Sequence, residues 1–328
     1  MAQSALWRGR VIADQPPEQT TACTPNGVTW RQICKSGSEN PDSKIGVYAG
    51  DAESYEVFWG QFRSIITQCH KVEFSDELAW QPDRDFFSPV QTPVLAQVRS
   101  TRLRLARNLA GVRFPAAMNA AERQQVYQLV KAGLQSMPGV LMPLDELTPS
   151  QKATLAAARM LFTDQDRFMA SANILDDWPI GRAIFISEDR FSGVWINEED
   201  HLRIISIVPG YNLPKAVEAL NTLLSALENR LSFAWSNRLG WLTSCPSNLG
   251  TGLRASVRAA CSPEDAGKFR QLGLQLRGEQ GEHTTVMDNV YDISPQQRLG
   301  VTEHQIMDQL NEALQSVFAS SETSQTLI

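Results

Sequence analysis

The segment Leu239–Arg258, which reads LGWLTSCPSNLGTGLRASVR, constrains the fold of this chain more than any other stretch. It begins with an apolar, β-prone run over Trp241–Thr243. It then places Cys245 directly before a proline, which disfavours helical geometry at the cysteine. Small and polar residues lead from there to Arg254 and Ser256. The pattern predicts a strand ending at the cysteine, a turn and a second strand.

Two interpretations fit this segment. In the first, glycines let backbone N–H groups approach an anion closely, and Arg254 adds a charged, planar fork that suits phosphate. A thiol at Cys245 beside such positive charge would ionise more easily than a free thiol. In the second, Cys245 is a buried structural cysteine in an ordinary strand–turn–strand unit.

Composition excludes several classes of protein. The net charge of −6 does not suggest generic binding to nucleic acid or to an anionic membrane, so any anionic ligand must be held by local arginines. Five cysteines without CxxC spacing indicate reduced thiols, and four scattered histidines offer no zinc spacing. The sequence contains neither an N-terminal targeting signal nor an apolar run of about 18 residues. We therefore expect a soluble, cytoplasmic protein, and the 328 residues suffice for one or two domains.

Hydrophobic periodicity and capping residues place secondary structure along the chain. Asn119 with Glu122 is typical of a helix start. Apolar residues at helical spacing predict helices over residues 29–35, 55–66, 119–134, 150–160, 213–231 and 263–272, and one after Thr302. Short β-prone runs predict strands over residues 183–187, 193–197, 202–208, 274–277 and 290–294.

Two charged patterns lie on the predicted strands. In a strand over residues 97–109, Arg102 and Arg104 share one face, where like charges repel unless they share an anion. Three consecutive carboxylates, Glu198 to Asp200, occur between two later strands in the run NEEDHLR. Such carboxylates cost stability unless a cation or a substrate offsets their repulsion. The ordinary alternative is an acidic hairpin tip in water.

Together these motifs resemble one protein family. CPSNLGTGLRAS, NEEDHLR, STRLR, RGEQGEHT and the loop ENPDSKIGVYAGDAESY occur in the order found in the guanidino (phosphagen) kinases, over about residues 28–318. The resemblance implies an α+β fold, with a small all-α N-terminal domain and a larger domain whose antiparallel β-sheet is flanked by α-helices. The implied division is an irregular segment over 1–28, a small helical domain with a substrate-specificity loop over 29–90, and an ATP-binding catalytic domain over 91–328.

The resemblance also implies roles for the matched residues. Glu199, Glu282 and Cys245 would be catalytic and would hold the guanidino group. The rest of the substrate would be bound by Ser43, Lys44, Ile45, Gly46 and Tyr48, through backbone N–H groups of this loop. The nucleotide would be bound by Ser100, Arg102, Arg104, Arg159, Arg203, Arg254, Ser256, Arg258 and Arg277. No residue would ligate a metal directly; Glu198 would lie near Mg²⁺ through water, and Asp42 would latch the loop onto the larger domain.

The activity implied is reversible phosphorylation of the guanidinium of free arginine, with ATP or ADP and Mg²⁺ as cofactors. Lys44 and Cys69 replace the family's usual Gly and Tyr, and they favour the alternative of another guanidino compound such as taurocyamine. Arg159 and Arg258 replace two histidines of the family, and Gln280 replaces a basic residue common in it.

Other functions stay open on the sequence. Arg159, Arg258 and Gln280 motivate the alternative of a non-catalytic nucleotide-binding regulator, although the presence of all five phosphate arginines and both carboxylates argues against it. The opening motif is shared with kinases of protein arginine side chains. The specificity loop argues against a protein substrate, because it suits small free molecules. The chain has no GxxxxGK[ST] segment, so it is not a P-loop kinase. The expected partners are small molecules, not nucleic acid or membrane, and the oligomeric state stays open.

Overall fold

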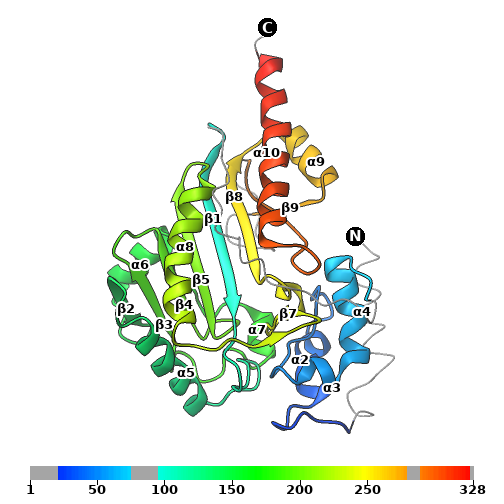
Figure 1. Cartoon of the computed structure of the whole chain (residues 1–328), viewed down its shortest axis with the longest axis vertical. Helices are drawn as coiled ribbons and strands as arrows, with labels where there is room; N and C mark the ends of the chain where they lie inside the picture. The colour runs from blue at the N-terminus through cyan, green and yellow to red at the C-terminus, as the bar shows by residue number, and fades with distance from the viewer. Residues whose placement is uncertain (1–20, 75–94, 279–288, 326–328) are drawn as a thin grey trace.

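The computed structural model describes residues 21–74, 95–278 and 289–325. A group of small helices near the N-terminus lies beside one end of a large sheet, at the lower right of Figure 1. The sheet has eight strands in the order β2-β3-β4-β5-β1-β8-β10-β9, and each neighbouring pair is antiparallel. The expected fold class is confirmed.

The strands are short except for those at the centre of the sheet. Their bounds are β1 Val98–Arg107, β2 Gly139–Pro143, β3 Ala183–Ser187, β4 Ser192–Ile196, β5 Leu202–Pro209, β8 Leu253–Ala260, β9 Leu274–Arg277 and β10 Val290–Pro295. A separate two-stranded ribbon pairs β6 (Trp235–Ser236) with β7 (Gly240–Trp241). The β-prone run over Trp241–Thr243 therefore contributes one strand residue, and the expectation of a strand reaching Cys245 was wrong.

Alternation along β1 decides which face of the sheet is apolar. Leu103 and Leu105 are buried in the main core, whereas Arg102 and Arg104 point to the opposite face. Helices α8 (Leu213–Glu228) and α10 (Glu303–Gln325) cover the apolar face, and both lie in front of the sheet in Figure 1. Each leucine buried between these layers contributes about 1.5–3 kcal/mol. The arginine-bearing face is left for the site.

The remaining helices begin where their capping residues require. The Asn119 side chain accepts a hydrogen bond from the Glu122 amide, and the Glu122 carboxylate accepts one from the Asn119 amide. Helix α5 therefore spans Ala120–Gly133, as expected. Helices α6 (Pro149–Ala157) and α9 (Pro263–Gln271) also lie within two or three residues of expectation. Several short elements were not expected, including the following two. Strand β2 is an exposed edge strand bounded by Gly and Pro, and α7 (Arg167–Ser171) is a single turn or so capped by Asp166.

The small helices share a hydrophobic core with residues of the larger domain, among them Phe114, Leu242 and Leu299, and hydrogen bonds also join the two parts. These helices are α2 (Trp30–Glu39), α3 (Ser54–Val57) and α4 (Trp59–His70), packed around Trp30, Phe58 and Phe62. The Tyr55 hydroxyl donates to the carbonyl of Thr243 at 2.7 Å, and the Ala49 amide donates to that of Ser244 at 2.7 Å. These bonds attach the helical part to the segment that leads into Cys245.

Candidate active site

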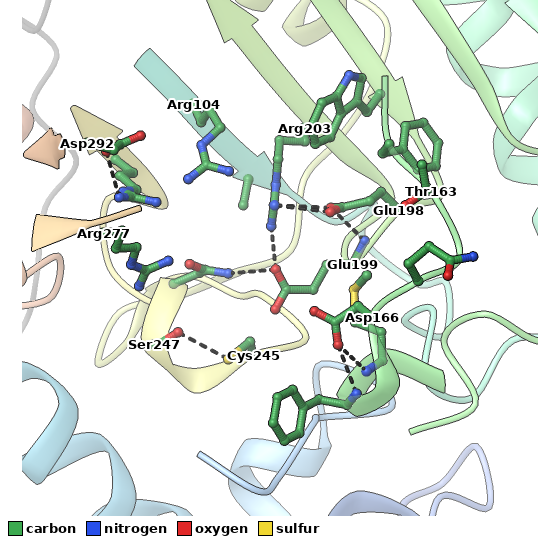
Figure 2. Close-up of a pocket in the computed structure, with 18 of the residues that line it drawn as sticks. Arg104, Thr163, Asp166, Glu198, Glu199, Arg203, Cys245, Ser247, Arg277 and Asp292 are labelled. Carbon is green, nitrogen blue, oxygen red and sulfur yellow. Dashed lines mark hydrogen bonds and ion pairs between the residues drawn. The ribbon is translucent and has the colours of Figure 1, made fainter. Parts of the chain in front are cut away.

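A cavity of about 1140 Å³ lies on the arginine-bearing face of the sheet, between that face, the 156–169 segment and the small helical part. Figure 2 shows Glu199 in the middle of it, with Arg203 above, Cys245 below, and Arg277 and Asp292 to the left. Of the residues singled out from the sequence, its wall contains Ser43, Lys44, Ile45, Tyr48, Arg102, Arg104, Arg159, Glu198, Glu199, Arg203, Cys245, Arg254 and Arg277.

Strand register brings the cationic side chains together. Arg104 on β1 lies directly opposite Arg254 on β8, and Asp292 on β10 lies opposite Arg277 on β9. The Arg254 Nη2 atom donates to Asp292 Oδ1 at 2.8 Å. Burial alone would raise the pKa of Asp292, but Arg254, Arg104 and Arg102 hold it below its ordinary value. One carboxylate thus lies among several guanidinium groups.

The charge of Arg102 and Arg104 is only partly compensated. Burial, together with other guanidinium groups nearby, lowers the pKa of Arg102 to about 10 and that of Arg104 well below its ordinary value. The Nε atoms of both are buried without a hydrogen-bond partner in the part of the chain that the structure describes. Buried donors and unbalanced positive charge of this kind fit a polyphosphate, which supplies charge and acceptors together.

The acidic run forms the β4–β5 turn at the edge of this cluster. Asn197 adopts φ +55°, and its Nδ2 donates to the carbonyls of Arg123 and Gly181, both at 2.9 Å, which holds the turn. Arg203 pairs with Glu198 at 3.2 Å and with Glu199. Burial raises the pKa of Glu198, although Arg203 opposes the shift. This acidic turn is therefore a buried cavity wall and not a hairpin tip in water.

The turn after Cys245 differs from the sequence interpretation in two respects. Burial and the nearby Glu199 carboxylate raise the pKa of the thiol well above its ordinary value, so the expected ease of ionisation is contradicted in the ligand-free protein. The glycines serve backbone packing: a Cβ on Gly250 would lie 2.3 Å from the Arg298 carbonyl oxygen, and one on Gly252 would lie 2.7 Å from that of Ala106. Both have positive φ, which glycine adopts without strain.

The specificity loop already uses part of its backbone within the protein. The Ser43 amide donates to the Asn40 backbone carbonyl, and the Tyr48 amide donates to that of Ile33. The Gly46 amide donates to the Ser43 hydroxyl, and all three distances are 2.9–3.0 Å. A substrate carboxylate could use these three amides only if those bonds broke. The expected latch is present, because Arg167 of α7 pairs with Asp42.

Asp200 connects the acidic turn to the Cys245 segment. Its Oδ1 accepts from Asn108 Nδ2 at 2.7 Å and from the Ser244 amide at 2.6 Å. Burial, and then the neighbouring Glu199, raise its pKa from 3.8 to about 7. The folded protein therefore keeps a proton on Asp200 over a range of pH in which the unfolded chain has lost it.

We expect Asp200→Asn to change how stability depends on pH. As pH rises from about 4 to 7, the raised pKa of Asp200 removes up to about 2–4 kcal/mol of wild-type stability, because only the unfolded state releases the proton. Burial lowers the pKa of His70 and His201 to about 4, which acts in the opposite sense over the same range. The informative quantity is thus the difference from wild type.

Urea unfolding at pH 4.5, 6 and 8 measures this difference. The Asp200→Asn protein should gain stability relative to wild type as pH rises, by about 2–4 kcal/mol in total. The exposed Asp145→Asn change is the matched control, because it also replaces a carboxylate with an amide, but at the surface. A difference from wild type that stays constant with pH for Asp200→Asn would contradict the assignment.

Some residues expected in the site lie elsewhere. Gly46, Ser100, Ser256 and Arg258 are not part of the cavity wall; Ser256 is buried and donates to the Arg102 carbonyl. Glu282 and Gln280 lie outside the described residues, as does most of the boundary region near residue 90.

The wall also contains polar residues that were not singled out from the sequence, among them Asn248, Asp292 and Arg298. Asp292 could have been found by its strand pattern, since it is the one charged residue of β10 and pairs in register with Arg277 on β9. Asn248 lies within the CPSN motif itself. Arg298 lies in the loop after β10, and nothing local in the sequence marks it.

No helix among the described residues has the length and apolar character needed to cross a membrane. The five cysteines are all free thiols in this structure.

Comparison with known proteins agrees with this geometry. The family profile "ATP:guanido phosphotransferase, C-terminal catalytic domain" matches residues 122–324, and that of the N-terminal domain matches residues 17–67. An arginine kinase of Liolophura japonica is 37% identical over 89% of this chain and 86% of its own, and one of Schistocerca americana is 38% identical over 90% and 86%.

Solved structures of related kinases superpose closely. The crystal structure of a lombricine kinase gives a TM-score of 0.86 at 32% identity and covers 93% of this chain and 88% of its own. A duplicated taurocyamine kinase of Schistosoma mansoni, bound to components of a transition-state analogue, gives 0.86 at 30% identity and covers 95% of this chain and 45% of its own. With two domain profiles in order and relatives of this similarity over most of the chain, the protein belongs to the ATP:guanido phosphotransferase family.

Proposed function

We propose that this protein transfers the γ-phosphoryl group of Mg-ATP reversibly to the guanidinium of free arginine. The observation that carries the proposal is that one cavity is lined by the arginine cluster and, beside it, by Glu199 and Cys245. A phosphate donor and a cationic acceptor can therefore meet there. The similarity to several arginine kinases supports arginine as the acceptor.

The arginines would hold the nucleotide phosphates. Arg102, Arg104, Arg203, Arg254 and Arg277 never deprotonate at neutral pH, and forked guanidinium groups match phosphate oxygens. Arg159, at the 156–162 side of the cavity, would stack on the base, and Arg258 would lie outside the direct contacts. Ser100 and Ser256, which were expected to bind the nucleotide, would instead support the strands that carry these arginines.

Mg²⁺ would arrive with the nucleotide. Within the described residues, no three His, Cys, Asp or Glu side chains form a cluster that could hold a metal ion. Mg²⁺ commonly keeps several waters and uses one or two carboxylates together with substrate phosphates. Glu198, at the cavity wall, is the carboxylate that would contact it through water.

The acidic side of the site would orient the acceptor. Glu199 uses Oε2 for Arg203 and Asn248, while none of the bonds among the described residues engages its Oε1. That oxygen can take a guanidinium N–H, fix the plane of the group and accept the proton that leaves during transfer. Glu282 would act from the opposite side, and a cation bound beside Cys245 would oppose the shift that burial gives its pKa.

A second candidate substrate has a specific observation in its favour. Lys44 is exposed and lines the cavity at the specificity loop, where an anionic tail would lie. The solved structures that resemble this chain include a lombricine kinase and a taurocyamine kinase. A coupled ADP-release assay with arginine, taurocyamine, lombricine, creatine, glycocyamine and an unfolded protein separates these possibilities. Turnover highest with arginine supports the proposal; ATP binding without turnover of any acceptor would indicate a regulator.

Lys44→Ala should weaken binding of the preferred acceptor without slowing transfer. An exposed ion pair with a substrate tail is worth up to about 1 kcal/mol, so KM should rise about three- to sixfold at unchanged kcat. Steady-state kinetics at saturating Mg-ATP measure this, with Lys35→Ala as a control lysine outside the cavity wall. A loss in kcat at unchanged KM would place Lys44 in the chemical step.

The proposed location is the cytoplasm, which the five free thiols support.

A further inference from the structure

A chain of hydrogen bonds leads from the small helical part to Glu199. It begins at His70, the last residue of α4, which is 1% exposed. Its Nδ1 lies 3.3 Å from the Arg298 amide nitrogen and 3.2 Å from that of Leu299, and both amides can only donate. The ring proton must therefore be on Nε2, which donates to the Pro246 carbonyl at 2.8 Å. His70 thus fastens two loops of the large domain to each other.

Arg298 carries the chain onward. The residue is 8% exposed, and its Nη1 donates to the Ser247 carbonyl at 2.7 Å and to Asn248 Oδ1. Because a guanidinium has only donors, it fixes which end of the Asn248 amide faces it. The oxygen of that amide faces Arg298, so its NH₂ group faces away.

The NH₂ group of Asn248 is directed at Glu199. Nδ2 lies 3.4 Å from Glu199 Oε2, the oxygen that also accepts from Arg203. Arg203 is one of the arginines assigned to phosphate, and it can release Glu199 when a nucleotide binds. Asn248 has no such second task in this geometry, so its contact would persist while the acceptor is bound.

We propose that Asn248 is a positioning residue for the phosphoryl transfer, oriented by Arg298 and through it by His70. It holds the Glu199 carboxylate so that Oε1 faces the acceptor guanidinium. The proposal rests on the role given to Glu199 above. A misplacement of such a group by about 1 Å can cost about a hundredfold in rate.

The first test is the kinetics of Asn248→Ala and Asn248→Asp. The aspartate keeps an acceptor for Arg298 but replaces the donor to Glu199 with a repelling carboxylate, whereas the alanine removes the donor without adding charge. Both variants should lower kcat about 10- to 100-fold, with KM for Mg-ATP within about twofold of wild type. Nucleotide-binding stoichiometry, measured by calorimetry, corrects for any inactive fraction. A loss of kcat smaller than threefold in both variants would overturn the proposal.

The second test asks whether His70 acts through Asn248. His70→Ala should lower kcat, and the double variant should lose much less than the product of the two single losses. Tyr55→Phe is the matched control. It removes the buried 2.7 Å hydrogen bond from the Tyr55 hydroxyl to the Thr243 carbonyl, which also joins the small helical part to the larger domain, and it leaves the bonds of His70, Arg298 and Asn248 intact. It should lower the melting temperature and keep kcat within about twofold. Two results would overturn the proposed connection, because each would indicate a general loss of contact between the two parts. One is an equal loss of kcat in Tyr55→Phe and His70→Ala. The other is a loss in the double variant that equals the product of the two single losses.

Glu199→Gln distinguishes the two layers of the argument. If that variant is inactive while the Asn248 variants are normal, only the positioning chain fails. If Glu199→Gln turns over normally, the role given to Glu199 fails first.

Discussion

Glu199→Gln should reduce kcat by about 10²- to 10⁴-fold while Mg-ATP still binds. The change removes a carboxylate charge from the centre of the cavity and leaves an amide of the same shape. General-base assistance and orientation of the acceptor account for a loss of that size. The nucleotide phosphates would contact the arginines instead, and Arg203 freed from one carboxylate should bind them at least as well.

Initial rates at saturating substrates measure kcat, and calorimetric titration with Mg-ATP measures nucleotide binding separately. Glu188→Gln is the matched control, because Glu188 is an exposed glutamate in the β3–β4 turn. It should keep kcat within about twofold. Wild-type turnover in Glu199→Gln would remove this residue from the mechanism, whereas loss of Mg-ATP binding would show that it acts on the nucleotide.

The second large effect is expected for Arg104→Met. Burial and repulsion from Arg102, Arg254 and Arg203 lower the pKa of Arg104, so its charge costs stability in the ligand-free protein. Methionine is similar in length and apolar, and replacing buried charge in this way is often neutral or stabilising by about 1–4 kcal/mol. The same change removes a charge-assisted fork worth about 3 kcal/mol to a phosphate, so Mg-ATP affinity should fall about 100-fold or more.

Urea unfolding without ligand and calorimetry with Mg-ATP test these opposite signs. Arg107→Met is the control on the same strand: Arg107 is buried, donates to the carbonyls of Ala106 and Thr251, and packs on Trp241 at 4.2 Å. It lies outside the cavity wall, so its loss should destabilise the fold and leave nucleotide affinity within about threefold. A destabilised Arg104→Met with unchanged affinity would refute the phosphate role.

Sequence reasoning was most accurate where local chemistry decides. The strand over residues 183–187 and the cap at Asn119 were located because alternation and capping act over a few residues. It was wrong where a short element is stabilised mainly by its neighbours, as for β2, α7 and the two-residue strand that contains Trp241.

In the candidate site, too, some residues were found from the sequence and others only from the structure. The resemblance located Glu199, Cys245 and Arg254, whereas Arg298 and Asp292 emerged only from the folded chain. The ionisation expected at Cys245 also failed, because sequence proximity to arginine says nothing of how deeply a thiol is buried.

The amino-acid sequence by itself determined the family, the α+β class, the capped helices and the alternation that puts Arg102 and Arg104 on one strand face. Tertiary structure alone decided that Arg104 lies opposite Arg254, and that Arg298, 50 residues beyond Asn248, sets the direction of its amide. The physical reason is range. Periodicity and capping record contacts within a few residues, whereas strand register and loop-to-loop hydrogen bonds depend on segments that meet only when the whole sheet has formed.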